Sequence, residues 1–201
     1  MQRIFILFLV LSGLFGASAC ALLKKKQKPT EIQPIPLASI AKQLADPSPL
    51  PVLLMVGKDK QLTIGLLSRG YNLIQVIDEE NQTDFRAEFA EFSDTRLRLT
   101  DFMQGKIGEN SPYSGIIMDE TQIGRPIWIK QNEDMLLNLW TRLEKGSSLF
   151  YFHYTEAASQ YGKKESSLLK DQFIEFGNTR FKQYQIDSTA IPGIHVLKFT
   201  K

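Results

Sequence analysis

The side chains in this sequence that could do chemistry are few and widely spaced. The chain has one cysteine, Cys20, and two histidines, His153 and His195. It contains no G-x-S-x-G segment that would present a serine nucleophile, so the two histidines do not predict a catalytic triad. Each histidine lies in an apolar run typical of a strand, where a ring with a satisfied hydrogen bond is the more common role. The residues therefore indicate no nucleophilic catalysis.

Metal ligands are equally sparse. The sequence has no C-x-x-C, H-x-x-x-H or EF-hand spacing. The pair Asp119-Glu120 follows an apolar run and could bind a cation weakly, although a solvated loop is the simpler interpretation. Asp78 and Asp101 also follow predicted strands. A carboxylate at a strand end can bind a ligand, cap the next helix or face solvent.

Strands and helices alternate in the region that must position these residues. Apolar or alternating runs predict strands at 52–56, 73–77, 96–100, 115–118, 149–154, 180–186 and 195–200. Helical spacing predicts helices that carry Leu62, Leu66 and Leu67, then Phe85, Phe89 and Phe92, and further helices at 133–144 and 164–176. Gly70 and Gly177 are predicted to end helices, and a turn at 188–193 joins the last two strands into a hairpin.

This alternation predicts one α/β domain. Strands separated by helices of ten or more residues pair in parallel with right-handed crossovers, so we expect a three-layer, open, mostly parallel sheet, Rossmann-like, with a C-terminal antiparallel hairpin. Such a sheet binds its ligand outside the carboxyl ends of its strands, beside the first strand. The predicted cleft is rimmed by residues 57–60, Asp78, Asp101 and the loop after Met118.

The first twenty residues have the features of a secretory leader. Arg3 is followed by an apolar run from Ile4 to Leu11 and by small residues up to Cys20. The leader resembles that of bacterial lipoprotein precursors, in which the cysteine becomes the first mature residue and carries a diacylglyceryl group. That resemblance implies a signal peptide at 1–19 and lipidation of Cys20.

Two alternatives to lipidation stay open. Ala17 stands where lipoprotein precursors usually have Leu, so Ala17-Ser18-Ala19 also fits the general signal peptidase, which would release a soluble secreted or periplasmic protein. An uncleaved membrane anchor is the weaker alternative, because the apolar run is shorter than the roughly 20 residues that a membrane span needs. Ala21, rather than Asp, after the cysteine favours sorting to the outer membrane, facing the periplasm.

Composition limits what the mature chain can be. With 43% hydrophobic and 23% charged residues, the composition is typical of a globular protein. A single cysteine cannot form a disulfide within the chain, so the fold must be stabilised by its core. Residues 20–50 are rich in Lys, Gln and Pro, which predicts a stalk, with helical spacing of Leu37, Ile40 and Leu44. The excess of positive charge behind the net charge of +2 lies in the leader and the lysines at 24–28, so no basic surface for nucleic acid is expected on the domain at 51–201.

The order of elements at 51–201 resembles the class I S-adenosylmethionine-dependent methyltransferase fold. Residues 52–57 resemble the first strand and glycine loop of that family, 70–78 its second strand with a terminal acid, 113–119 its fourth strand and 143–154 the approach to its fifth. In the family, the acid after the second strand binds the ribose of the cofactor. The resemblance therefore implies cofactor-binding roles for Gly57, Asp78 and, next to the adenine, Asp101.

The glycine loop departs from the family pattern D/E-x-G-x-G-x-G. When the loop is aligned at Gly57, the acid is replaced by Met55, and the second and third glycines are replaced by Asp59 and Gln61. Glycine permits the close approach of a ligand to the backbone, and side chains here would stand in its place. S-adenosylmethionine is also made and used in the cytoplasm, so an exported enzyme would lack its cofactor.

The sequence therefore favours a lipoprotein of the cell envelope whose methyltransferase-like domain is a non-catalytic pseudo-enzyme with no cofactor. We expect it to act as a scaffold or binding component of an outer-membrane assembly, such as a secretion complex, with the membrane and other envelope proteins as partners. The alternative is a methyltransferase that uses S-adenosylmethionine, or a protein that binds another small ligand in the same cleft. Tyr151, Phe152 and Tyr154, with Trp128 and Tyr161, could form an apolar patch for a partner if exposed.

Overall fold

The computed structural model describes residues 40–56, 60–101, 112–119, 133–154, 162–180, 183–191 and 194–201. The chain divides into two compact units, Met1–Thr30 and Glu31–Lys201, and every described residue belongs to the second. The predicted leader, Cys20, Gly57 and Glu120 lie outside the described residues.

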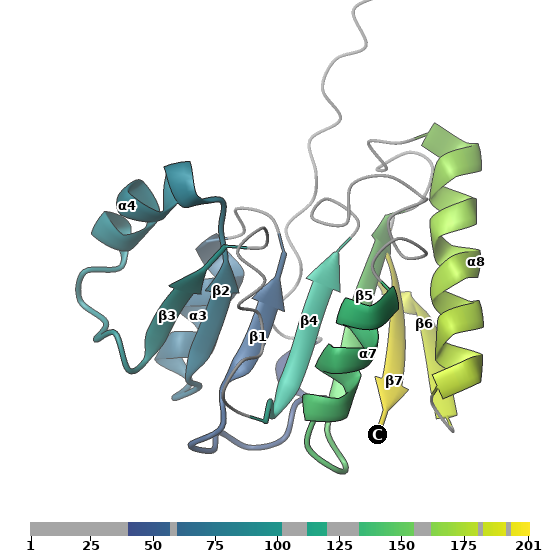
Figure 1. The fold of residues 1–201 in the computed structure, drawn as a ribbon, viewed down its shortest axis with the longest axis horizontal. Coiled ribbons are helices and arrows are strands. Elements are labelled where there is room, and N and C mark those ends of the chain that lie inside the picture. The colour runs from purple at the N-terminus through teal and green to yellow at the C-terminus, as the bar shows by residue number, and fades with distance from the viewer. Residues whose placement is uncertain are drawn as a thin grey trace, which may run out of the picture. The chain divides into compact units, whose positions relative to one another are not determined.

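The described residues form a seven-stranded sheet in the order β3-β2-β1-β4-β5-β7-β6. Its strands are β1 (Val52–Met55), β2 (Leu73–Val76), β3 (Leu97–Thr100), β4 (Gly115–Asp119), β5 (Ser148–Tyr154), β6 (Gln183–Ile191) and β7 (Ile194–Thr200). The first five pair in parallel, whereas β7 is antiparallel to both β5 and β6. Figure 1 shows β1 and β4 at the centre of this sheet. The predicted parallel sheet with a C-terminal hairpin is confirmed.

Helices cover both faces of the sheet, which confirms the three layers. They are α3 (Lys60–Ser68), α4 (Glu79–Glu88), α7 (Glu133–Arg142) and α8 (Gly162–Arg180). One apolar core lies between the sheet and α3, and it includes Leu62 and Leu66. A second core, on the other face, includes Leu139 of α7 and Phe173 of α8 (Figure 1). None of the described helices combines the length and apolar character that crossing a membrane requires.

The described chain before β1 packs against the domain and forms hydrogen bonds with it. Ile40 and Leu44, two positions of the predicted short helix, are buried in the same core as α3. Beyond them, the Tyr71 hydroxyl donates a hydrogen bond of 2.8 Å to the carbonyl of Ala45, and the Ser114 hydroxyl donates one of 3.0 Å to the carbonyl of Leu50. Residues 40–50 are therefore part of the folded domain.

Two predicted boundaries in the second half are wrong. Helix α8 does not end before Gly177 but continues to Arg180, and Gly177 is a buried residue within it. A Cβ atom at Gly177 would lie 2.0 Å from Cε1 of Phe199, so this glycine gives space to a ring of β7 instead of ending the helix. Strand β6 continues to Ile191, through the predicted turn, and an irregularity in its pairing with β7 between Asp187 and Ile191 absorbs the extra length.

The phenylalanine face after β2 is shorter than predicted. Helix α4 ends at Glu88, so Phe89 is its C-cap residue and Phe92 lies in the turn that follows. The rings of Phe85 and Phe89 stack with their centroids 4.6 Å apart, and Phe92 packs partly buried against the same core. The three side chains share one core, as predicted, but only Phe85 lies within the helix.

Gly70 ends the segment after α3 as predicted, and its backbone requires glycine. Its φ angle is +95°, and a Cβ atom would lie 3.6 Å from Pro47, an ordinary contact. We therefore expect Gly70→Ala to lower the free energy of unfolding by about 1–2 kcal/mol, purely through backbone strain. Gly70→Asn should cost less, because Asn tolerates positive φ better than Ala does. Urea unfolding measures both, and an unchanged midpoint for Gly70→Ala would contradict this explanation.

Candidate functional site

The carboxyl ends of the central parallel strands form the edge at which this kind of sheet binds ligands. The connection after β1 leads to β2 on one side, and the connection after β4 leads to β5 on the other, so the two neighbouring strands β1 and β4 have connections that leave in opposite directions at this point. Asp78 follows β2, Asp101 follows β3, and Asp119 is the last residue of β4. The fold thus brings all three predicted carboxylates to one edge.

Asp78 presents an uncommitted carboxylate at this edge. It is exposed and occupies the N-cap position of α4, but its side chain makes no capping hydrogen bond. Its backbone carbonyl instead accepts a bond of 2.8 Å from the amide of Asn81. A carboxylate that is free of the helix can accept hydrogen bonds from the hydroxyl groups of a ligand.

Asp101 and Asp119 have a different environment. Asp101 is 7% exposed and Asp119 is 3% exposed, and each makes a polar or electrostatic contact within the chain. The prediction that Asp119 belongs to a solvated loop is wrong, because the residue extends β4 and pairs in register with Phe152 of β5. Both carboxylates are therefore buried at this edge and already interact with other residues of the chain. No group of three potential metal ligands occurs among the described residues.

The end of β1 is apolar where the methyltransferase pattern has an acid. Met55 is 1% exposed and packs into the core on the α7 and α8 face, and Val56 is buried in the opposite core. Gln61, at the position of the third glycine, lies exposed in the first turn of α3. The described flanks of the loop therefore carry neither the acid nor the third glycine.

A buried polar network supports this edge from within the core, and the sequence reasoning missed it. The Gln75 Nε2 atom donates a hydrogen bond of 3.1 Å to the Val56 carbonyl, and the Thr63 hydroxyl donates one of 3.1 Å to Gln75 Oε1. Gln75 is 1% exposed and Thr63 is 0% exposed. The available signal was a single amide in an otherwise apolar strand, since a buried amide needs partners. The network joins β2 and α3 to the last described residue before position 57.

A small cavity of about 200 Å³ lies between the start of α3 and the side of α4. Ile77 and Phe85 form its apolar part, and an ion pair between Lys60 and Glu88 crosses its rim. Asn81 and Asp84 complete the lining. The cavity adjoins Asp78 along the chain, so it belongs to the same edge of the sheet.

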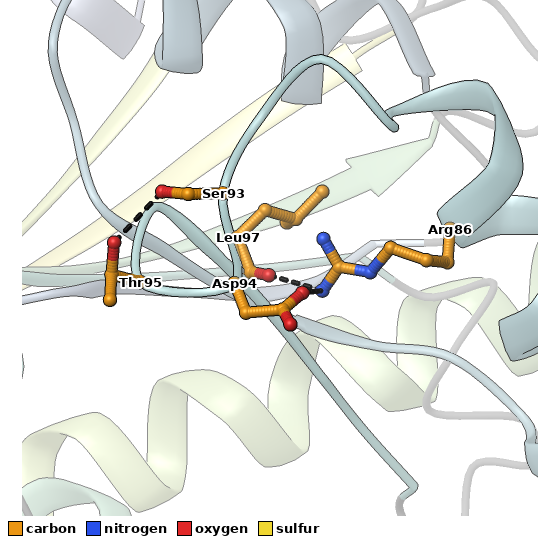
Figure 2. Close-up of polar contacts among 5 residues, drawn as sticks. All are labelled: Arg86, Ser93, Asp94, Thr95 and Leu97. Atoms are coloured by element: carbon orange, nitrogen blue, oxygen red, sulfur yellow. Dashed lines mark hydrogen bonds and ion pairs between the residues drawn. The ribbon is translucent and has the colours of Figure 1, made fainter.

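Helix α4, which lines this cavity, is held to β3 by one arginine. Arg86 Nη2 donates a hydrogen bond to the Leu97 carbonyl and lies 3.2 Å from an oxygen of Asp94 (Figure 2). Ser93 and Thr95 share a hydrogen bond of 2.8 Å in the same turn. The Arg86 contacts join α4 to β3 and to the turn that precedes it.

The two histidines lie opposite each other on β5 and β7. His153 pairs in register with His195, and their ring centroids are 6.2 Å apart. His153 is buried within β5, as predicted for a strand residue, and makes a contact within the chain. The prediction of a satisfied hydrogen bond is wrong for His195, because its Nδ1 atom is buried without a hydrogen-bond partner. Burial, followed by the nearby charges of Lys170 and His153, lowers the pKa of His195.

The aromatic residues of β5 do not form a surface patch. Tyr151, Phe152 and Tyr154 are all buried in the two cores, and Trp128 and Tyr161 lie outside the described residues. The ring of Tyr151 stacks on Phe173 of α8 at a centroid distance of 3.7 Å. The described aromatic residues of this strand therefore stabilise the domain from inside.

Comparison with known proteins separates the fold from the function. The sequence matches no protein-family model and no curated protein. Among solved structures, a candidate O-methyltransferase of Nostoc punctiforme has a TM-score of 0.59 and 12% identity over 83% of this chain. The present chain spans only 56% of the length of that protein.

Two further neighbours were solved with SAH. A candidate methyltransferase of Streptococcus mutans has a TM-score of 0.56 and 11% identity, with 83% of this chain and 98% of that chain covered. Human methyltransferase-like protein 13 has a TM-score of 0.56 and 14% identity, with 82% and 79% covered. Identities this low establish a common fold and leave activity open.

Proposed function

We propose that this chain, which has the class I S-adenosylmethionine-dependent methyltransferase fold, uses it as a non-catalytic module of a cell-envelope assembly. In this proposal Cys20 carries a lipid that anchors the protein to the outer membrane, facing the periplasm. The domain contributes binding surfaces to a larger complex, such as a secretion complex, and needs no cofactor.

The observation that carries the non-catalytic part of the proposal is the burial of Met55. In the methyltransferase family this position holds an acid beside the amine of the cofactor. Met55 is instead 1% exposed and belongs to the apolar core. A thioether cannot provide the charge that an ammonium group needs, and restoring a carboxylate here would bury a charge in the core. The side chain that replaces the acid, Met55, thus packs as part of the apolar core.

The environment of the loop adds two supporting points. Gln61 places an exposed side chain at the position of the third glycine, and Lys60 next to it is engaged in an ion pair with Glu88. The exported location that we propose is consistent with this, because the cofactor is made and used in the cytoplasm. Both points favour a fold that is retained for its surfaces and not for methyl transfer.

The lipid anchor and the assembly are tested together by fractionating cells that express the full chain. Cys20→Ser should move the protein from the membrane to the soluble fraction and abolish its co-purification with envelope proteins, because the variant cannot be lipidated. Ala21→Asp is the matched control: it keeps the cysteine and should shift the protein from the outer to the inner membrane. Release of the unaltered chain, unaffected by Cys20→Ser, would instead indicate a soluble secreted protein.

The alternative function is a methyltransferase, or a protein that binds another small ligand at the same edge. The observation in its favour is Asp78, whose exposed carboxylate is not used as a cap. If this alternative holds, Asp78→Ala should weaken the binding of S-adenosylhomocysteine at least tenfold. Glu91→Ala, which removes another exposed carboxylate that follows α4, should leave that affinity unchanged.

A further inference from the structure

Strand β3 forms one edge of the sheet, and its backbone hydrogen bonds show which of its residues face outward. Among the described strands β3 pairs only with β2. The carbonyls of Arg96 and Thr100 accept hydrogen bonds from the amides of β2 and of the residue that follows it, so these two residues face β2. Backbone groups of successive residues in a strand point to opposite sides. Leu97 and Leu99 therefore direct their N–H and C=O groups away from the sheet.

Both outward groups of Leu97 already have partners within the chain. The Leu97 amide donates a hydrogen bond of 3.0 Å to the carbonyl of Ser93. The Leu97 carbonyl accepts a hydrogen bond from Nη2 of Arg86 (Figure 2). A strand that joined the sheet at this edge would need the same groups for its own backbone hydrogen bonds. The guanidinium group of Arg86 therefore occupies the place of a backbone donor of such a strand.

Arg86 is held in this position from both of its ends. Its backbone belongs to α4, and the preceding residue, Phe85, is 4% exposed and anchors that helix in the core. Its guanidinium group lies 3.2 Å from an oxygen of Asp94, whose side chain is 90% exposed. An ion pair as exposed as this one adds little stability. It still orients the guanidinium group toward the edge of β3 (Figure 2).

Stability alone does not favour an arginine at this position. The Nη1 atom of Arg86 is buried and has no hydrogen-bond partner among the described residues. A buried donor without an acceptor costs free energy, and methionine or leucine would cover the same part of α4 without that cost. Apart from the exposed pair with Asp94, the contact that only a hydrogen-bond donor supplies here is the bond to the Leu97 carbonyl.

We propose that Arg86 closes the edge at β3 to a second copy of this chain and so prevents the protein from associating through its sheet. Edge strands are templates for pairing with other chains, and proteins protect them with charged side chains. Two copies of β3 would pair antiparallel about a two-fold axis, through the Leu97 carbonyl and the outward groups of Leu99. The exposed side chain of Arg98 stands on a face of the sheet and leaves these groups uncovered. This inference is independent of cofactor binding and of the proposed function.

The test is the oligomeric state of Arg86→Met in the full chain that also carries Cys20→Ser, which excludes a disulfide-linked dimer. Light scattering during size-exclusion chromatography measures the mass at rising protein concentration. We expect the mass of Arg86→Met to rise from that of one chain to that of two, whereas the chain with Arg86 keeps the mass of one. Arg86→Leu, another strong helix former, should behave like Arg86→Met. Arg86→Lys keeps a donor for the Leu97 carbonyl and should stay a single chain.

Arg96→Met is the matched control. It also removes a guanidinium group that donates to backbone carbonyls, those of Leu67 at 2.7 Å and Tyr71 at 3.2 Å, so it should lose stability without associating. Hydrogen exchange locates the contact, because the Leu99 amide of Arg86→Met should exchange more slowly as the protein concentration rises. A single-chain mass for Arg86→Met and Arg86→Leu, both folded by circular dichroism, would overturn the proposal. Equal association of Arg96→Met, or a dimer with unchanged exchange at Leu99, would also overturn it.

Discussion

Replacing Gly177 by alanine should lower the free energy of unfolding by about 2–4 kcal/mol, at the upper end of the cost of overpacking a core. Alanine normally improves the interior of a helix by nearly 1 kcal/mol relative to glycine, so the sign of this effect is decided by contact with Phe199. The added Cβ atom would lie 2.0, 2.6 and 2.9 Å from three ring carbons of Phe199. That ring is 0% exposed in the core, so it cannot turn aside into solvent.

Urea unfolding followed by circular dichroism measures this cost. Asn178→Ala is the matched control, because the next residue of α8 is exposed and should be neutral or slightly stabilised by alanine. Shortening the ring in Gly177→Ala/Phe199→Leu should cost less than the sum of the two single substitutions. A Gly177→Ala variant as stable as the original chain would show that α8 does not pack on β7 in this way.

Replacing Gln75 by leucine should cost about 2–4 kcal/mol, because it removes two buried hydrogen bonds, one of them to the backbone carbonyl of Val56. The Val56 carbonyl loses the donor at 3.1 Å, and the Thr63 hydroxyl loses the acceptor at 3.1 Å. Leucine has nearly the size of glutamine, so a cavity contributes little to the loss. Since the network ends at Val56, the variant should also increase amide hydrogen exchange at the start of α3.

Gln82→Leu is the matched control. Gln82 also donates to a backbone carbonyl, that of Ile77 at 3.0 Å, but at a partly buried position where water can replace the amide. Its loss should cost under about 1 kcal/mol. Thr63→Val should cost less than Gln75→Leu, because it removes only one of the two bonds. Equal effects of Gln75→Leu and Gln82→Leu would contradict the importance of the buried network.

The sheet could be predicted from sequence because its strands are continuous apolar runs. Residues 52–56 and 149–154 have few polar interruptions, and such runs separated by amphipathic helices fit only a parallel sheet covered on both faces. The hairpin followed from two alternating runs close together. These signals are local, so they required no knowledge of which strands are neighbours.

Several of the errors and omissions depend on contacts with residues that are remote in sequence. Gly177 has the appearance of a helix end, yet its role is set by Phe199 on another strand. Asp119 appears to start a loop, but pairing with Phe152 extends the strand through it. Gln75 gives no local sign that its partners are Thr63 and Val56.

The candidate site was predicted only in outline. The order of elements was enough to place Asp78 and Asp101 at one edge of the sheet, because parallel strands end together. It could not separate the exposed carboxylate of Asp78 from the buried one of Asp101, since burial depends on the surrounding elements.

The central claim is that this domain has the methyltransferase fold without its cofactor site, and calorimetric titration of S-adenosylhomocysteine into the full purified chain tests it most directly. We predict no saturable heat up to millimolar ligand, because Met55 and Gln61 occupy positions that the family reserves for an acid and a glycine. Saturable binding at micromolar affinity, equivalent to about 8 kcal/mol, would contradict the claim and establish a working cofactor site.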